Sequence, residues 1–169
     1  LRLRWHSAGI ALTINEVIFT LDAPVDRSRE LLAELSIDRT WVRLVELSRN
    51  YGQHSATVAG ILYSSSDWVV TLDEDMQHRP AHVETLLTRI FPDGIDIVYA
   101  LPEKPVHGGG YRDLSSRLVK WVIAKFSGNR FVSSFNSFRL IRGDIARAAS
   151  SVCGQHTYFD VALTWFTDR

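Results

Sequence analysis

The sequence predicts an α/β domain with a doubly wound, mostly parallel sheet and helices on both faces. Short apolar runs with the composition of strands alternate along the chain with segments whose apolar residues recur at helical spacing. The run WVVTLD is apolar at almost every position, which is typical of a strand covered on both faces. The 169 residues are enough for one domain with its own core, which we expect to cover residues 1–169.

The elements follow from local patterns taken in order. Strands are predicted at residues 16–22, 41–47, 68–73, 95–101 and 134–142. Helices are predicted at residues 27–35 with Asp26 as N-cap, at 53–65, at 81–91 after Pro80, at 111–126, at 143–152 and over the amphipathic end 161–169. Proline and glycine predict a loop over residues 102–110.

Composition limits the classes of partner. Nineteen basic and nineteen acidic residues give a net charge of zero, so the chain shows no overall attraction for nucleic acid. The single cysteine, Cys153, excludes an internal disulfide and suits a reducing compartment. No apolar run approaches the roughly 20 residues that span a bilayer. We therefore expect a cytoplasmic protein.

Carboxylates crowd the end of the predicted strand at 68–73. In open α/β sheets, ligands bind beyond the carboxyl ends of the strands, where Asp73 and Asp75 lie. Residues i and i+2 of an extended segment point the same way, so both side chains can reach one ion, and Gln77 can add a ligand. Oxygen ligands suit Mg²⁺ or Mn²⁺. The alternative is an ordinary solvated acidic loop.

Two linked segments resemble family 2 glycosyltransferases of GT-A fold. LSRNYGQHSATVAGI (47–61) is followed by DWVVTLDEDMQHRP (67–80), at the spacing that the family shows. The nearest group is the polyprenyl-phosphate sugar transferases, similar to dolichyl-phosphate mannose synthase. The likeness extends from residue 16 to about residue 145, which is most of the chain.

The resemblance implies roles for particular residues. Asp73, Asp75 and Gln77 would hold the divalent ion, and Asp22 would contact the nucleotide base. The other implied contacts are Arg49, Asn50 and Gly52 beside the nucleotide, and Arg112 and Ser116 at an acceptor phosphate. Apart from the resemblance, Asp160 is an acid in an otherwise apolar stretch and a candidate general base, with a solvated helix residue as the alternative.

The implied reaction is inverting, metal-dependent transfer of a glycosyl group from a nucleotide diphospho-sugar to polyprenyl phosphate or a cell-envelope saccharide. The basic, tryptophan-bearing helix at 111–126 either covers the sheet or lies in a lipid headgroup layer. The second position would give peripheral membrane contact at the inner face of the cell membrane.

Departures from the family pattern leave alternatives open. The family's first strand is absent, since residues 10–17 are only superficially similar to it, so we expect an N-terminally incomplete domain. An unpaired strand edge would then favour oligomers. Leu21 replaces an aspartate, and Ser137 stands where relatives carry glycine or an acid. A truncated or non-catalytic nucleotide-sugar-binding homologue is one alternative. A haloacid-dehalogenase-type phosphatase is another, against which Gln77 and the mid-chain position of the motif argue.

Overall fold

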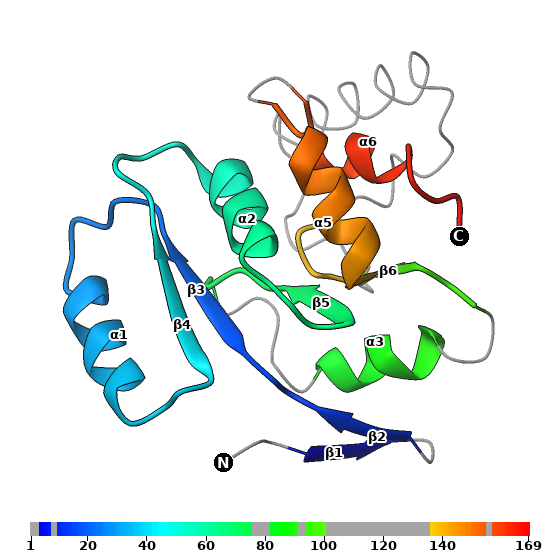
Figure 1. The fold of residues 1–169 in the computed structure, drawn as a ribbon, viewed down its shortest axis with the longest axis horizontal. Coiled ribbons are helices and arrows are strands. Elements are labelled where there is room, and N and C mark those ends of the chain that lie inside the picture. The colour runs from blue at the N-terminus through cyan, green and yellow to red at the C-terminus, as the bar shows by residue number, and fades with distance from the viewer. Residues whose placement is uncertain (1–3, 8–9, 76–81, 91–93, 101–135, 155–156) are drawn as a thin grey trace, which may run out of the picture.

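Strands and helices alternate along the chain, which confirms the α/β class (Figure 1). A computed structural model describes residues 4–7, 10–75, 82–90, 94–100, 136–154 and 157–169. The predicted loop at 102–110 and helix at 111–126, as well as Pro80, lie outside the described residues.

The first half of the fold is built on two parallel strands. β3 (Val17–Leu21) pairs with β4 (Val42–Glu46), and α1 (Ser28–Ile37) connects them. α1 begins one residue later than predicted, so Arg27 and not Asp26 is its N-cap residue. The Asp26 carboxylate still accepts the N–H of Ser28 at 3.0 Å. The carboxyl end of β3 therefore lies beside the carboxyl end of β4, as expected for a strand–helix–strand unit.

The second half contains one antiparallel strand, whose direction the sequence did not predict. β7 (Arg139–Arg142) lies between β5 (Trp68–Thr71) and β6 (Ile97–Tyr99) and runs antiparallel to both. β5 and β6 are consequently parallel to each other. The direction of a strand depends on the connection that precedes it, which the strand's own side-chain pattern does not specify. The start of β7 thus lies beside the end of β5.

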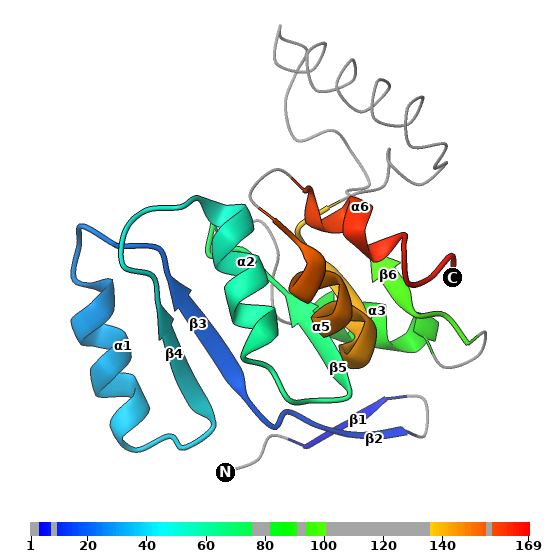
Figure 2. The same cartoon turned by 45° about the horizontal axis from the view of Figure 1, so that its top comes forward.

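Alternation along these three strands builds two apolar clusters. On one face, Val69, Ile97 and Ile141 are aligned across the sheet and pack with residues of α2 (Gln53–Leu62), α5 (Gly143–Val152) and α6 (Phe159–Leu163). On the other face, the aligned residues Val70, Val98 and Leu140 pack against α3 (His82–Ile90). Figure 2 shows α2, α5 and α6 together on one side. Helices on both faces confirm the doubly wound arrangement around this sheet.

α6 is shorter than the predicted C-terminal helix. Its last helical residue is Leu163, after which the N–H groups of Trp165 and Phe166 bond three residues back and tighten the chain into a turn. Both aromatic side chains are exposed. The tail then runs beside β6, where the carbonyl of Arg169 accepts the N–H groups of Asp96 and Ile97. The C-terminal tail thus pairs with the backbone at the start of β6 and does not continue α6.

A hairpin at the N-terminal end was not predicted. β1 (Arg4–Ser7) and β2 (Ile10–Thr13) pair antiparallel with each other, and they join no other strand among the described residues. Each has four residues, too few for a clear alternation.

Glu16 holds three segments together just before β3. Its Oε1 accepts the N–H of Ser65 at 2.7 Å and the Ser65 hydroxyl at 3.0 Å, and its Oε2 accepts Nη1 of Arg43 at 2.6 Å. Arg43 lies on β4, and Ser65 precedes β5. This carboxylate therefore links the two halves of the fold at the end opposite to the predicted site.

Candidate glycosyl-transfer site

The predicted site segments meet at one end of the fold. Asp22 comes directly after β3, the loop 49–52 leads into α2, and Asp73 follows β5. This is the carboxyl end of the parallel strands, where ligands of open α/β sheets bind. Sequence spacing alone did not show that these segments touch, and hydrogen bonds join them here.

Asp22 holds the loop before α2 with both carboxylate oxygens. Oδ1 accepts the N–H of Tyr51 at 2.7 Å, and Oδ2 accepts the N–H of Gly52 at 2.7 Å. The side-chain amide of Asn50 reaches the carbonyl of Asp22 at 3.5 Å. The structure thus brings Asp22, Asn50 and Gly52 together, while contact with a nucleotide base stays a prediction.

Gly52 is required by the backbone at this point. Its φ of 87° and ψ of 158° belong to a region that is essentially limited to glycine. The residue turns the chain from the loop into α2, and its carbonyl accepts the N–H of Ala56 at 3.1 Å. Any other residue would have to leave this conformation and would weaken the bond to Asp22.

Arg49 lies over the neighbouring aromatic ring. Its guanidinium carbon is 4.8 Å from the centroid of the Tyr51 ring, within the range of a cation–π contact. Hydrogen bonding from Ser48 and Arg49 lowers the pKa of the exposed Tyr51 hydroxyl. Arg49 is therefore held against Tyr51 within the loop, and its predicted contact with a nucleotide stays a prediction.

Asp73 is held from two sides. Its Oδ1 accepts Nε2 of Gln53 at 2.7 Å, and its Oδ2 accepts the hydroxyl of Ser137. Gln53 is the first residue of α2, and Ser137 lies just before β7. Because Gln53 follows Gly52, one continuous set of contacts runs from Asp22 to Asp73.

The donor set at this position suits a hard cation. Asp75 lies two residues beyond Asp73 and is exposed. Within the described residues, no group of three or more His, Cys, Asp or Glu side chains is arranged to hold a metal. Mg²⁺ usually binds proteins through one or two carboxylates and completes its shell with phosphate and water, so two carboxylates are sufficient. The remaining predicted positions, Gln77, Arg112 and Ser116, lie outside the described residues.

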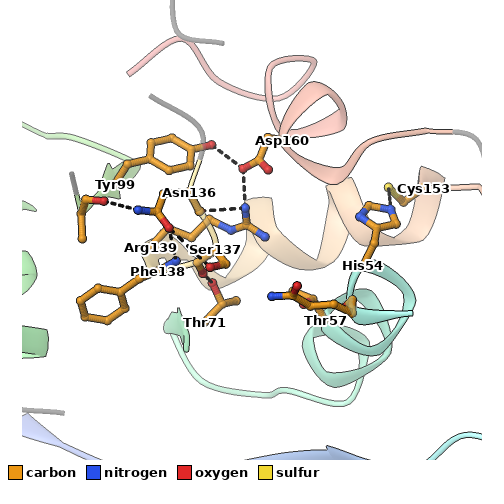
Figure 3. A network of polar contacts seen from close by, with 12 residues as sticks. His54, Thr57, Thr71, Tyr99, Asn136, Ser137, Phe138, Arg139, Cys153 and Asp160 are labelled. Atoms are coloured by element: carbon orange, nitrogen blue, oxygen red, sulfur yellow. Dashed lines mark hydrogen bonds and ion pairs between the residues drawn. The ribbon is translucent and has the colours of Figure 1, made fainter. Parts of the chain in front are cut away.

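Asp160 is buried, so the expected solvated helix position is wrong. It is 1% exposed, and its Oδ1 accepts both Nη1 of Arg139 at 2.5 Å and the Tyr99 hydroxyl at 2.8 Å (Figure 3). Burial and the Asp160 charge raise the pKa of Tyr99 well above its usual range. These contacts give Asp160 a structural part in the buried ion pair, and its role as a base stays a prediction that its burial does not favour.

The turn before β7 is anchored on three sides. Nδ2 of Asn136 donates to the carbonyl of Ala100 at 2.6 Å, and the hydroxyl of Thr71 donates to the carbonyl of Ser137. Nη1 of Arg139 also donates to the carbonyl of Asn136 at 3.1 Å. Figure 3 shows these side chains around the start of β7. The turn is therefore tied to the ends of β5 and β6 and, through Arg139, to α6.

Cys153 and His54 form a second contact near the start of α2. The sulfur is 3.9 Å from Nε2 of His54 (Figure 3). It also donates to the carbonyl of Thr157 at 3.1 Å. The His54 ring stacks on Tyr158, with 5.7 Å between centroids. Burial raises the pKa of the Cys153 thiol, which disfavours the reactive thiolate. These residues pack α2 against the segment before α6.

Gln53 was not predicted as a site residue, and Ser137 was noted only as a departure from the family pattern. Twenty positions separate Gln53 from Asp73 and sixty-four separate Ser137 from it, so no local pattern signals either contact. The one available clue is that Ser137 lies in the first half of the strand predicted at 134–142, whose start can reach the same end of the sheet.

The sequence is similar to known sugar transferases. The sequence matches glycosyl transferase family 2 over residues 11–159. It is 30% identical over 156 residues to an undecaprenyl-phosphate 4-deoxy-4-formamido-L-arabinose transferase of Edwardsiella ictaluri, a match that covers 91% of this chain and 47% of the relative. The transferase of the same name from Pseudomonas paraeruginosa is 32% identical over 152 residues, with 89% and 44% covered.

The chain spans about half the length of the curated relatives it matches. The family match nevertheless includes every described residue of the contact set around Asp22 and Asp73. It does not support the alternative of a haloacid-dehalogenase-type phosphatase. By its sequence, the chain belongs to glycosyl transferase family 2.

Proposed function

We propose that this domain transfers a glycosyl group from a nucleotide diphospho-sugar to polyprenyl phosphate, with inversion at the anomeric carbon. The observation that carries the proposal is the continuous contact set from Asp22 through residues 51–53 to Asp73, at the carboxyl end of the parallel strands. The curated relatives are named as undecaprenyl-phosphate transferases, which favours a lipid phosphate over a saccharide as acceptor.

Each part of the site has a separate task in this proposal. Asp22 and the loop that it holds would border the nucleotide, with Arg49 beside it. Asp73 and Asp75, together with Gln77, would hold a Mg²⁺ or Mn²⁺ ion against the diphosphate. The bound ion would stabilise the charge that develops on the departing diphosphate. These carboxylates would then be the residues that orient the leaving group.

A phosphate acceptor fits a site whose candidate general base, Asp160, is buried. A lipid phosphate is already ionised, so its oxygen can attack without a general base, whereas a sugar hydroxyl would need one. Asp160, the candidate base, is 1% exposed and paired with Arg139. The arrangement therefore favours the acceptor that requires no proton removal.

The test is binding of UDP, GDP and dTDP to the whole chain by calorimetry, with and without Mn²⁺. We expect Asp75→Asn to weaken metal binding and nucleotide binding together, because the ion would bridge protein and diphosphate. Asp144→Asn is the matched control, since Asp144 is an exposed carboxylate in the first turn of α5, at the opposite end of β7. Unchanged Mn²⁺-dependent binding in Asp75→Asn would contradict the metal assignment.

The alternative of a non-catalytic nucleotide-sugar-binding homologue makes a different prediction. A chain that binds nucleotide in a Mn²⁺-dependent way, but transfers no sugar to undecaprenyl phosphate in detergent, would support it. Transfer that is lost in Asp75→Asn would support catalysis by this domain.

A further inference from the structure

We propose that Gln53 and Ser137 are positioning residues that fix the orientation of the Asp73 carboxylate for cation binding. The inference rests on the proposed function and extends it to two residues that do not themselves touch substrate. Each donates one hydrogen bond to a different oxygen of Asp73, from Gln53 Nε2 at 2.7 Å and from the Ser137 hydroxyl. The carboxylate is therefore restrained at both oxygens, so it cannot rotate without losing a bond.

The chemistry of the two donors suits this task. An ionised carboxylate offers about four lone-pair sites, so one bond to each oxygen leaves sites for a cation. Amide and hydroxyl donors are neutral and leave the negative charge of Asp73 intact. A lysine or arginine at either position would restrain the carboxylate equally well, but it would repel the ion. Gln53 and Ser137 thus fix the orientation of the Asp73 carboxylate without reducing the negative charge that attracts the cation.

Gln53 derives its own position from the neighbouring loop. It follows Gly52, whose N–H is held by Asp22 at 2.7 Å, and it begins α2. The backbone that places the Gln53 side chain is therefore the backbone that Asp22 fixes. Through this residue, the orientation of Asp73 depends on the loop proposed to border the nucleotide.

Ser137 is placed by a buried framework. Its carbonyl accepts the Thr71 hydroxyl, and the preceding Asn136 is bound to the end of β6. Two residues on, Arg139 is 5% exposed and joins the turn to Asp160. The side-chain oxygen of Asn136 is the more distant acceptor for the Ser137 hydroxyl, at 3.4 Å. The hydroxyl proton is accordingly directed at Asp73.

The test compares Ser137→Ala with Ser137→Thr in calorimetric titrations of the whole chain with UDP, GDP and dTDP. Loss of a hydrogen bond to a charged group should weaken the Mn²⁺-dependent affinity about tenfold in Ser137→Ala. Binding without metal should not change, because the restraint acts on the cation ligand. Ser137→Thr keeps the hydroxyl and should retain wild-type affinity. Gln53→Met, which lacks the amide donor at similar length, should lose affinity as Ser137→Ala does.

Ser151→Ala is the matched control, since the Ser151 hydroxyl is exposed and its one bond among the described residues is to the carbonyl of Ala148 in its own helix. A double-mutant cycle of Ser137→Ala with Asp73→Ala, measured as unfolding free energy, checks the contact without any ligand and should be non-additive. An additive cycle, or wild-type Mn²⁺-dependent affinity in Ser137→Ala, overturns this inference alone. A wild-type chain that binds none of the three nucleotides overturns the proposed function, and the positioning role falls with it.

Discussion

At the scale of single residues, the buried Arg139–Asp160 ion pair is the contact whose loss we expect to destabilise the fold most. Arg139 and Asp160 are 5% and 1% exposed, and their side chains meet at 2.5 Å. The Arg139 guanidinium also lies over the Phe159 ring, 4.8 Å from its centroid. Two charges removed from water are tolerated only while each compensates the other.

We expect Asp160→Asn to lower the free energy of unfolding by about 3–5 kcal/mol, because Arg139 would be left as an uncompensated buried charge. Urea denaturation followed by circular dichroism would measure the change. The double variant with Arg139→Met should recover part of the loss, since it removes that charge. Asp144→Asn breaks the exposed pair with Arg142 and should have little effect. A loss in Asp160→Asn no larger than in Asp144→Asn would contradict this account.

The sequence could identify Asp73 and Asp160 as unusual, but it predicted the surroundings of only one of them, the position of Asp73 after a strand. Asp73 ends an apolar run predicted to be a strand, and ligands of open α/β folds generally bind at the carboxyl ends of strands. The partner of Asp160 lies twenty-one residues away on β7, so its burial depends on tertiary packing. The acid in an apolar stretch thus indicated an unusual environment, but not whether Asp160 is a catalytic base or part of a buried ion pair.

At the scale of elements, Glu16 joins the start of β3 to β4 and to the segment before β5. Burial alone would raise the pKa of Glu16, but hydrogen bonds from Ser65 and Arg43 outweigh it and lower the pKa below its usual value of 4.5. The folded state therefore holds the proton less readily than the unfolded state. The stability that Glu16 contributes is fully present above pH 4.5, and it is lost as the pH falls from there through the folded-state pKa.

We expect Glu16→Gln to destabilise the protein by about 1–3 kcal/mol at pH 7, since hydrogen bonds to a charged group are lost. The difference from wild type should shrink as the pH is lowered below 4.5. Urea unfolding at a series of pH values measures it, with Glu34→Gln on exposed α1 as the control for a lost surface carboxylate. A difference that stays constant from neutral to acid pH would show that the charge of Glu16 is not responsible.

Most elements could be predicted from the sequence, whereas their pairing could not. β3 to β6 lie within the predicted apolar runs, and α2 and α5 begin at the predicted residues. Periodicity encodes these elements because it reports which face is buried. The antiparallel direction of β7 depends on the preceding connection, and the β1–β2 hairpin is too short to give a pattern. Both features depend on how segments pair with one another, which the pattern within one segment does not report.

At the scale of the whole molecule, the proposed lipid acceptor would require contact with a membrane surface. None of the described helices is both long and apolar enough to cross a bilayer. The basic segment at 111–126, which lies outside the described residues, carries the composition of an interfacial helix in its sequence. The proposed acceptor would have to be met at such a surface.

We expect weak, salt-sensitive binding of the chain to vesicles that contain anionic lipid. Each basic residue near the surface contributes about 1 kcal/mol, so Lys120→Glu with Lys125→Glu should reduce binding in flotation assays at low salt. Arg27→Glu with Arg39→Glu changes the charge equally at exposed positions at the two ends of α1 and is the control. A wild-type chain that stays wholly in solution would favour a saccharide acceptor instead.

The ion pair between β7 and α6 also restricts how this sequence can evolve. Neither Arg139 nor Asp160 can be exchanged alone for a neutral residue without an intermediate that carries one stranded charge in the interior. The two positions should therefore change together or not at all across descendants of this chain. A lineage that adopted residue 160 as a proton acceptor would first have to give Arg139 another partner, and it would release the turn that carries Ser137.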